Sequence, residues 1–535
     1  MSFLEIENLK LSIHGTPILK NISLKAERGE KIGVIGESGS GKSMTAFCVM
    51  GLLPPGAEVS GSIKLDEQPL LQKTERQMCA LRGNDIGMIF QEPMTALNPV
   101  KTIGDQVAET VLIHGGATRT EARKIARATL NRVGLPADQF PLNRYPHELS
   151  GGQRQRVVIA MAIALRPKLL IADEPTTALD VTTQAQILAL LEQLVVEDGM
   201  CLMLITHDLA VVSDVADHLV IMKSGKVVES GETRKVFHEM QHPYTRALFT
   251  ASSHVPDRDR QSETKDMPVL EVKSVVRDYA IPRKGLFAKQ TYFRAVDAVS
   301  FAIKRGESLG LVGESGCGKS TLTRAILGLD AVQGGTICVA GTAVSAGSHM
   351  PRALRRKMQV VFQDPYGSFN PRHKVARLIA EPFHLLDNPP SGSARQLAVD
   401  EALRSVGMVA ADAQKYIHEF SGGQRQRIAI ARALIIRPDL IILDEAVSAL
   451  DVSVRAQILD LLAELSDRLK LSYLFISHDL SVVRSITERV IIMKSGVIVE
   501  HGETKTVFEN PQHPYTQELI NAAPNLQEIL TKEIV

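Results

Sequence analysis

Short hydrophobic runs alternate with longer segments of helical periodicity along this chain. Three of the runs are IGVI at residues 32–35, LLIA at 169–172 and CLMLIT at 201–206. Short runs of this kind, rich in branched side chains, are typical of strands that are buried on both faces of a sheet. Because the runs alternate with helical segments, the pattern predicts a mostly parallel sheet with helices packed on both faces.

A second pattern occupies the segment between Gln91 and Ser150. Stretches such as TEARKIARATLNRVGL, residues 120–135, have helical character and contain no strand-like run. We interpret this segment as a helical subdomain inserted into the α/β core, and we expect its counterpart between Gln363 and Ser421.

The whole pattern occurs twice. Asp173 and Asp444 are 271 positions apart, and so are His207 and His478. A repeat of constant offset predicts two copies of one domain. We place the first domain at residues 1–250, a polar, charged linker at 251–268 and the second domain at 269–535. The copies differ in length between Gly36 and Gln91, 55 positions against 50 between Gly313 and Gln363, and we expect this difference in a single surface region, at β-hairpin turns before Gln91.

Composition narrows the function classes. The chain has 535 residues with 61 basic and 60 acidic side chains, so its net charge gives no argument for nucleic acid as a partner. Its five cysteines are scattered without metal-binding spacing, which indicates reduced thiols in the cytoplasm. No apolar run approaches the roughly 18 residues needed to span a bilayer, so we expect any membrane-spanning part on other chains.

Each copy carries a glycine-rich loop between a hydrophobic strand and a helix, GESGSGKS in the first and GESGCGKS in the second. Glycines let backbone N–H groups surround phosphate oxygens, and the following helix adds its positive end. In each loop the lysine should neutralise the β- and γ-phosphates and the last serine should hold Mg²⁺. The predicted nucleotide-binding residues are Gly36, Glu37, Ser38, Gly39, Ser40, Gly41, Lys42 and Ser43, with Gly313, Glu314, Ser315, Gly316, Cys317, Gly318, Lys319 and Ser320.

An acidic pair ends a later hydrophobic strand in each copy. Asp173 and Asp444 should emerge at the strand tip beside the phosphate loop and hold Mg²⁺. The next carboxylates, Glu174 and Glu445, should polarise the attacking water. The alternative, that these are solvated charges at a sheet edge, is disfavoured by the phosphate loops.

A third motif, LSGGQ in the first copy and FSGGQ in the second, precedes a helix. Two glycines before a helix N-terminus form another anion-binding surface. The predicted residues are Ser150, Gly151, Gly152 and Gln153, with Ser421, Gly422, Gly423 and Gln424.

Together these motifs resemble the ATP-binding subunits of ABC transporters over essentially the full chain. The resemblance implies two tandem ABC-type P-loop NTPase domains, each a RecA-like α/β core with an antiparallel β portion and an inserted helical subdomain. It also implies that the two domains, called cassettes, pair so that each P-loop meets the opposite signature motif and binds ATP and Mg²⁺. By resemblance, Gln91 and Gln363 join the metal site, His207 and His478 assist Glu174 and Glu445 in catalysis, and residues 178–180 and 449–451 form the D-loops.

Further motifs indicate which group of ABC transporters the chain resembles. QEPMTALNP at 91–99, QDPYGSFNPR at 363–372, and HPYT at 242–245 and 513–516 resemble importers of dipeptides, oligopeptides, nickel and glutathione. The fusion of two cassettes is similar to the ATPases of the microcin C/oligopeptide importer and of the glutathione importer. The resemblance implies an ATP-hydrolysing motor at the cytoplasmic face of the bacterial inner membrane, with two transmembrane permease subunits and a solute-binding protein. Oligopeptide, dipeptide, a glutathione-like solute, an opine or nickel remain open as cargo, and a peptide-like solute is favoured.

Two departures from the family pattern matter. Related subunits often carry a cysteine cluster directly after HPYT, and because neither the stretch after His242 nor the C-terminal tail contains a cysteine, we expect no iron–sulfur cluster. Tyr279 should stack on adenine in the second cassette, whereas Ile13 stands at the matching place in the first. We therefore expect the first site to bind ATP more weakly, unless His14 substitutes.

Two other classes use tandem cassettes without membrane segments. Ribosome-associated translation factors place a long charged helix between the cassettes, but the joint here is about twenty residues long and lacks helical periodicity. DNA-repair and chromosome-organising ATPases carry coiled-coil or zinc-binding insertions, and none is apparent between Gln91 and Ser150. The near-zero net charge also disfavours nucleic acid, so the importer motor is the preferred hypothesis.

Overall fold

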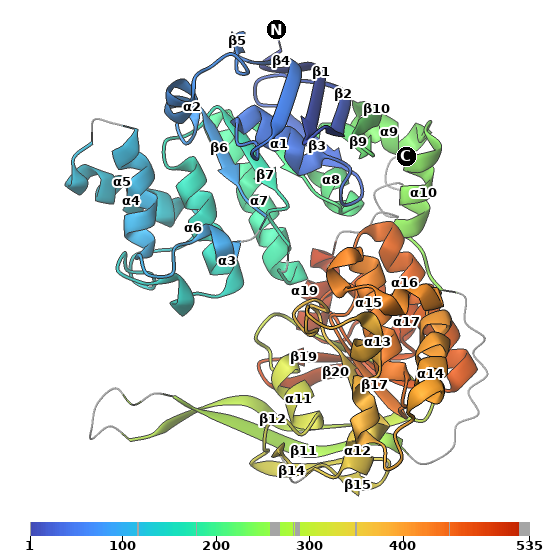
Figure 1. Cartoon of the computed structure of the whole chain (residues 1–535). Helices are drawn as coiled ribbons and strands as arrows, with labels where there is room; N and C mark the ends of the chain where they lie inside the picture. The colour runs from blue at the N-terminus through green and yellow to red at the C-terminus, as the bar shows by residue number, and fades with distance from the viewer. Residues whose placement is uncertain are drawn as a thin grey trace.

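Two α/β units follow one another along the chain, and Figure 1 shows the first, blue to green, above the second, yellow to red. The computed structural model describes residues 2–91, 93–114, 117–177, 179–256, 268–281, 283, 289–347, 350–448 and 450–523. Most of the expected linker, residues 257–267, lies outside them. Within the described ranges, no helix combines the length and the apolar character needed to cross a membrane.

The first unit is built on a six-stranded sheet in the order β10-β9-β3-β8-β7-β6. All neighbouring strands run parallel except β10, which pairs antiparallel with β9. Strands β7 and β8 are buried along their whole length because helices cover both faces of the sheet. The predicted mostly parallel sheet is confirmed. Its strands are β3 (Lys31–Ile35), β6 (Ile86–Ile89), β7 (Leu169–Asp173), β8 (Cys201–Ile205), β9 (His218–Lys223) and β10 (Lys226–Glu232).

A four-stranded antiparallel sheet and a group of helices complete the first unit. The sheet has the order β2-β1-β4-β5, with β1 (Leu4–Ile13), β2 (Thr16–Ala26), β4 (Ala57–Leu65) and β5 (Gln68–Pro69). The helices α4 (Ile103–Ile113), α5 (Arg119–Arg132) and α6 (Gly151–Ile163) form the expected helical subdomain, to the left in Figure 1. Helix α5 begins at a capping box, in which Thr118 and Glu121 satisfy each other's backbone N–H groups. The remaining helices are α1 (Lys42–Met50), α2 (Glu75–Leu81), α3 (Pro93–Ala96), α7 (Val181–Asp198), α8 (Leu209–Val215), α9 (Thr233–Glu239) and α10 (Pro243–Ser252).

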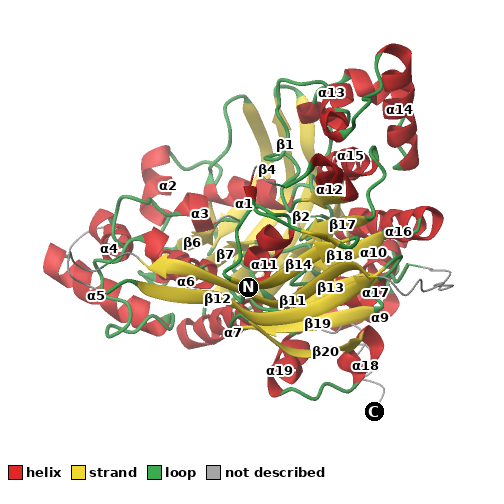
Figure 2. Ribbon diagram, turned by 90° about the horizontal axis from the view of Figure 1, so that it is seen from below, coloured by secondary structure: helices red, strands yellow, loops and turns green. Residues whose placement is uncertain are grey.

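The second unit repeats this architecture. Its sheets have the orders β16-β17-β18-β13-β19-β20 and β12-β11-β14-β15. In Figure 2 its helical subdomain, α13 to α15, lies on the opposite side of the molecule from α4 to α6. The strands are β11 (Pro268–Ile281), β12 (Thr291–Lys304), β13 (Ser308–Val312), β14 (Gly334–Val339), β15 (Thr342–Ala343), β16 (Met358–Val361), β17 (Leu440–Asp444), β18 (Ser472–Ile476), β19 (Arg489–Lys494) and β20 (Val497–Glu503). The helices are α11 (Lys319–Ile326), α12 (Arg352–Lys357), α13 (Val375–Ile379), α14 (Gly392–Ser405), α15 (Gly422–Leu434), α16 (Val452–Leu469), α17 (Leu480–Ile486), α18 (Thr504–Glu509) and α19 (Pro514–Ala522).

The two copies differ most at the hairpin that opens each unit. Strands β1 and β2 have 10 and 11 residues, whereas β11 and β12 have 14 each. Figure 1 shows the β11–β12 hairpin projecting well beyond its sheet. This difference precedes the phosphate loops, so it is additional to the one expected between each phosphate loop and its glutamine. Counting forward from the phosphate loops overlooked this hairpin because it precedes the loop.

Candidate functional site

Each P-loop lies between a buried central strand and a helix, β3 and α1 in the first unit and β13 and α11 in the second. Gly36 has φ 151°, and a Cβ there would lie 2.1 Å from the carbonyl oxygen of Met222, so only glycine fits. The N-cap of α1 is Gly41, which supplies no side-chain hydrogen bond. The first backbone N–H groups of α1 therefore have no capping side chain and can bind an anion.

Both P-loop lysines are held inside their loops. Lys42 and Lys319 are each 6% exposed. The Nζ of Lys42 donates to the carbonyl oxygen of Gly36 at 2.7 Å, and that of Lys319 to Gly313 at 2.6 Å. Burial lowers the pKa of Lys42. These loop carbonyls hold each ammonium group where phosphate oxygens could replace them.

The predicted metal-binding oxygens lie close together in the first site. Ser43 Oγ donates to Asp173 Oδ1 at 3.1 Å. Burial raises the pKa of Asp173 to about 6, although the Ser43 hydrogen bond opposes the shift, and burial likewise raises the pKa of Asp444. A cation beside these carboxylates would offset the free-energy cost of burying them in their charged form. A hydroxyl and a carboxylate are hard oxygen donors, which fit Mg²⁺.

A glutamate and a histidine form an ion pair in both copies. His207 Nδ1 is 3.4 Å from Glu174 Oε2, and His478 Nδ1 is 3.3 Å from Glu445 Oε1. Burial would raise the pKa of Glu174, but the hydrogen bond and charge of His207 lower it to about 2. Burial would lower the pKa of His207, but Glu174 raises it. The second pair shifts in the same directions, so both glutamates are held as carboxylates that can act as bases.

Both glutamates also have a strained backbone. Their φ angles are 48° for Glu174 and 50° for Glu445, in the left-handed region that side chains other than glycine rarely adopt. The Glu174 N–H donates to Ile205 and the Glu445 N–H to Ile476, at 2.8 and 2.9 Å, which fixes this geometry. Strain of this kind is concentrated at functional sites.

The glutamines predicted at the metal sites lie differently in the two copies. Gln91 Nε2 donates to Glu174 Oε2 at 3.0 Å, so it contacts the candidate base. Gln363 is exposed. In the described part of the chain, no hydrogen bond joins Gln363 to Glu445. The amide of Gln91 thus acts here as a donor to the carboxylate, and its metal-binding role stays a prediction.

The signature motifs form the N-termini of α6 and α15. Ser150 caps α6 and exchanges hydrogen bonds with Gln153, and Ser421 caps α15 in the same way with Gln424. A Cβ on Gly152 would lie 2.4 Å from the Thr183 side chain, so glycine lets α6 pack against α7. In Figure 1, α6 lies clear of α11 in the other unit. The structure therefore does not bring the signature motif of the first unit onto the second P-loop.

Instead, the last residue of each D-loop and the start of the helix that follows it contact the opposite P-loop. Asp451 Oδ1 accepts a hydrogen bond from Ser38 N at 2.7 Å, and Ser453 Oγ donates to Glu37 at 2.5 Å. The opposite pair of contacts joins Ser315 N to Asp180 Oδ2 at 3.3 Å and Thr182 to Glu314 at 2.8 Å. Ala178 and Ala449 of the predicted D-loops lie outside the described residues. Sequence reasoning missed these side-chain contacts, since each joins residues far apart in the chain.

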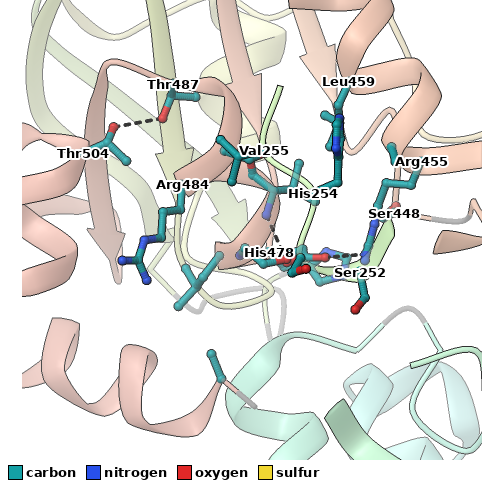
Figure 3. A pocket seen from close by; sticks show the side chains of 18 of the residues that line it. Ser252, His254, Val255, Ser448, Arg455, Leu459, His478, Arg484, Thr487 and Thr504 are labelled. Atoms are coloured by element: carbon teal, nitrogen blue, oxygen red, sulfur yellow. Dashed lines mark hydrogen bonds and ion pairs between the residues drawn. The ribbon is translucent and has the colours of Figure 1, made fainter. Parts of the chain in front are cut away.

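A cavity of about 1030 Å³ lies between the units at this junction. Both His207 and His478 line it. Figure 3 shows His478 and Arg455 on its wall. The two candidate hydrolysis sites therefore border one shared space.

Strand pairing aligns Tyr279 with Ile13. Leu4 of β1 pairs with Leu65, and Leu270 of β11 pairs with Val339 in the same way. The pairing register of β1 and of β11 also shifts at the same distance from these residues. Counting nine positions from Leu4 and from Leu270 reaches Ile13 and Tyr279. The Tyr279 hydroxyl donates to Asp330 at 3.2 Å and its ring faces the Arg277 guanidinium at 4.6 Å. Adenine stacking on Tyr279 stays a prediction.

Comparison with known proteins agrees with this geometry. The ABC transporter family model matches residues 19–177 and 296–448, which is more than half of the chain. The chain belongs to the ABC transporter family of ATP-binding proteins. The model of the oligopeptide/dipeptide transporter C-terminal region matches residues 228–273 and 499–534, which include both HPYT motifs. ATP hydrolysis at paired cassettes is the activity characteristic of this family.

Curated relatives extend over almost the whole chain. It is 45% identical to the glutathione import ATP-binding protein GsiA of Escherichia coli K12, over 97% of this chain and 89% of that protein. Identity to GsiA of Salmonella paratyphi A is 46%, with the same coverage. Among solved structures, CbiO1 of Clostridium perfringens is 29% identical and covers 46% of this chain and 98% of its own, with a TM-score of 0.40. The predicted family and the two-cassette fold are confirmed.

Proposed function

We propose that this chain is the ATP-hydrolysing motor of an importer for a peptide-like solute. The observation that carries the proposal is the Glu–His pair, formed at 3.4 Å in one cassette and 3.3 Å in the other. A cassette that had lost hydrolysis would not need to keep both partners in place. The relationship to GsiA and the match to the oligopeptide/dipeptide transporter region support an importer.

In this proposal each ATP is bound by one P-loop and hydrolysed at the strand tip beside it. Lys42 and Lys319 bind the phosphates, and Glu174 and Glu445 polarise the attacking water with His207 and His478 beside them. Ser43, Gln91 and Asp173 hold Mg²⁺ in one site, and Ser320, Gln363 and Asp444 hold it in the other. Mg²⁺ held there would supply positive charge beside the β- and γ-phosphates.

In this proposal, closure of the two cassettes onto each other completes each ATP site. Ser421–Gln424 would cover the first P-loop and Ser150–Gln153 the second. Because α6 stands clear of α11, the helical subdomains must move relative to the opposite P-loops before the signatures reach the phosphates. Such a movement, driven by ATP binding and reversed by hydrolysis, is what the motor would transmit to its membrane partners.

The proposed partners are two transmembrane permease subunits and a solute-binding protein, with this chain on the cytoplasmic face of the bacterial inner membrane. The relatives named GsiA serve glutathione import, which favours glutathione or a related peptide as cargo. An oligopeptide is the second candidate, since the HPYT regions match the oligopeptide/dipeptide transporter model.

Reconstitution tests this proposal directly. The chain, its permeases and its binding protein are placed in proteoliposomes, and ATP-dependent accumulation of labelled glutathione is compared with that of a labelled oligopeptide. We expect uptake of a peptide-like solute that Glu174→Gln and Glu445→Gln each reduce severely. Uptake that continues without ATP would refute the motor function. Near-normal hydrolysis in either single variant would instead refute the equal competence of the two sites.

A further inference from the structure

The HPYT motifs at residues 242–245 and 513–516 are outside the nucleotide-hydrolysis motifs, yet they are fixed by the same contacts in both cassettes. His242 caps α10, where its Nδ1 accepts from Tyr244 N at 3.1 Å, and His513 caps α19 in the same way. The Glu229 carboxylate of β10 accepts from the N–H groups of Gln241 and His242. The start of α10 is therefore anchored to the sheet, which leaves the tyrosine little freedom.

The tyrosine of each motif reaches the P-loop of its own cassette. The Glu37 N–H donates to Tyr244 Oη, and the Glu314 N–H donates to Tyr515 Oη, both at 3.1 Å. Tyr244 is 6% exposed and Tyr515 2%, so these hydroxyls are acceptors in a nearly dry environment. Without the hydroxyl, a P-loop N–H would lose its hydrogen-bond partner at a part-buried position, which costs free energy. Such a loss would disturb the loop that must surround phosphate.

The helix that carries each tyrosine also packs against the opposite cassette. Helix α10 contacts α16, and α19 contacts α7. Val452 of α16 belongs to the same buried cluster as Tyr244 and Phe249. Val452 directly follows Asp451, which accepts the hydrogen bond from Ser38 in the P-loop. Tyr244 thus lies between its own P-loop and the segment of the other cassette that contacts the same loop.

We propose that Tyr244 and Tyr515 are positioning residues that couple each P-loop to the helix that packs against the opposite cassette. The HPYT segment then has a defined task, because a change in the P-loop on ATP binding is transmitted through the tyrosine to the contact between cassettes. The inference rests on the proposed function as an ATP-driven motor. The simpler alternative is that these tyrosines only fill the core, and the two explanations make different predictions.

The test compares Tyr244→Phe and Tyr515→Phe with Tyr473→Phe as a matched control. Tyr473 is fully buried and its hydroxyl donates to the Leu462 carbonyl at 3.1 Å, so the control also removes a buried hydroxyl, from β18. We expect the two HPYT variants to weaken binding of a fluorescent ATP analogue and raise KM for ATP by about five- to tenfold, with a much smaller change in kcat. Tyr473→Phe should lower the thermal unfolding temperature and leave KM unchanged.

A cross-link between the cassettes reports the second half of the proposal. His254 Nε2 and Asp460 Oδ1 are 2.6 Å apart across the interface, so cysteines at these positions, in a Cys79→Ser background and joined by a short bifunctional thiol reagent, provide the probe. ATP should change the rate of cross-linking, and in Tyr244→Phe this response should require more ATP by the same factor as the loss of affinity. An unchanged affinity in both HPYT variants, or an equal loss in Tyr473→Phe, would overturn the proposal. Because nucleotide binding is measured separately, a chain that binds but does not hydrolyse ATP would refute the motor function and leave this comparison valid.

Discussion

Asp451 Oδ1 accepts a hydrogen bond from the backbone N–H of Ser38, 2.7 Å away in the P-loop of the other cassette. The carboxylate of its counterpart Asp180 accepts hydrogen bonds from two different elements. It caps α7 by accepting from Thr183 N at 3.0 Å, and it accepts from Ser315 N of the opposite P-loop at the longer distance of 3.3 Å. Asp451 makes no side-chain cap for α16. Asp180 therefore both caps its own helix and contacts the opposite cassette, whereas Asp451 serves mainly the contact.

This difference predicts opposite outcomes for the two alanine variants. Asp180→Ala loses a helix cap worth about 1 kcal/mol, so it should lower the thermal unfolding temperature more. Asp451→Ala loses mainly the short contact to Ser38, so it should reduce ATP turnover more and unfold near the parent temperature. Differential scanning calorimetry and a steady-state ATPase assay measure both effects. Equal unfolding temperatures for the two variants would contradict the assignment of capping to Asp180 alone.

The Glu174–His207 pair predicts a pH dependence of stability. The pKa of His207 is raised from 6.5, so its contribution is fully present below pH 6.5 and is lost as pH rises through the folded-state value. The pKa of Glu174 is lowered from 4.5 to about 2, so its contribution is present above pH 4.5 and is lost as pH falls toward 2. The pair is strongest between these limits. The stabilisation that wild type shows over His207→Gln in thermal unfolding should therefore be larger at pH 6 than at pH 9, and a constant difference would contradict the charged pair.

The position shared by Tyr279 and Ile13 predicts unequal nucleotide affinity. Stacking of a base on an aromatic ring is worth on the order of 1–3 kcal/mol. Lys319→Ala should leave the first site as the main ATP-binding site, and Lys42→Ala should leave the second. Titration of each variant with ATP therefore compares the affinities of the two sites. The first site should bind about tenfold more weakly, and Ile13→Tyr should recover most of the difference. Equal affinities would mean that another group, such as His14, replaces the ring.

Much of the nucleotide site could be predicted from the sequence because its motifs are local. The P-loop needs its glycines, lysine and serine within eight positions, and the strand before it is recognisable from its branched side chains. The bond between Tyr244 and Glu37 could not be predicted, since it joins positions 207 residues apart and depends on how α10 docks. Repetition was the available clue, because Tyr244 and Tyr515 stand at the same offset as the catalytic candidates. The long β11–β12 hairpin was missed for a different reason, since it precedes the motif from which the copies were aligned.

Arg455 predicts a further inequality between the cassettes. It lies on α16 and its Nη1 donates to Asp479 Oδ2 at 2.8 Å, directly beside His478. In the first cassette Gln184 stands at the matching place, and a neutral amide cannot form this ion pair with Asp208. Since the two Glu–His distances are nearly the same, the difference lies in what holds the histidine loop rather than in the pair itself.

Arg455→Gln should therefore slow hydrolysis mainly at the second site. Vanadate trapping of 8-azido-ATP, followed by peptide mapping, reports how trapped nucleotide divides between the two P-loops. We expect the second P-loop to lose at least half of its share in Arg455→Gln, to keep it in Arg455→Lys, and to keep it in Arg468→Gln, which removes a charge from the same helix at an exposed pair with Glu464. The double variant Arg455→Gln/Gln184→Arg should move the trapped nucleotide toward the first P-loop. An unchanged division in Arg455→Gln would show that the ion pair with Asp479 does not position His478 for hydrolysis.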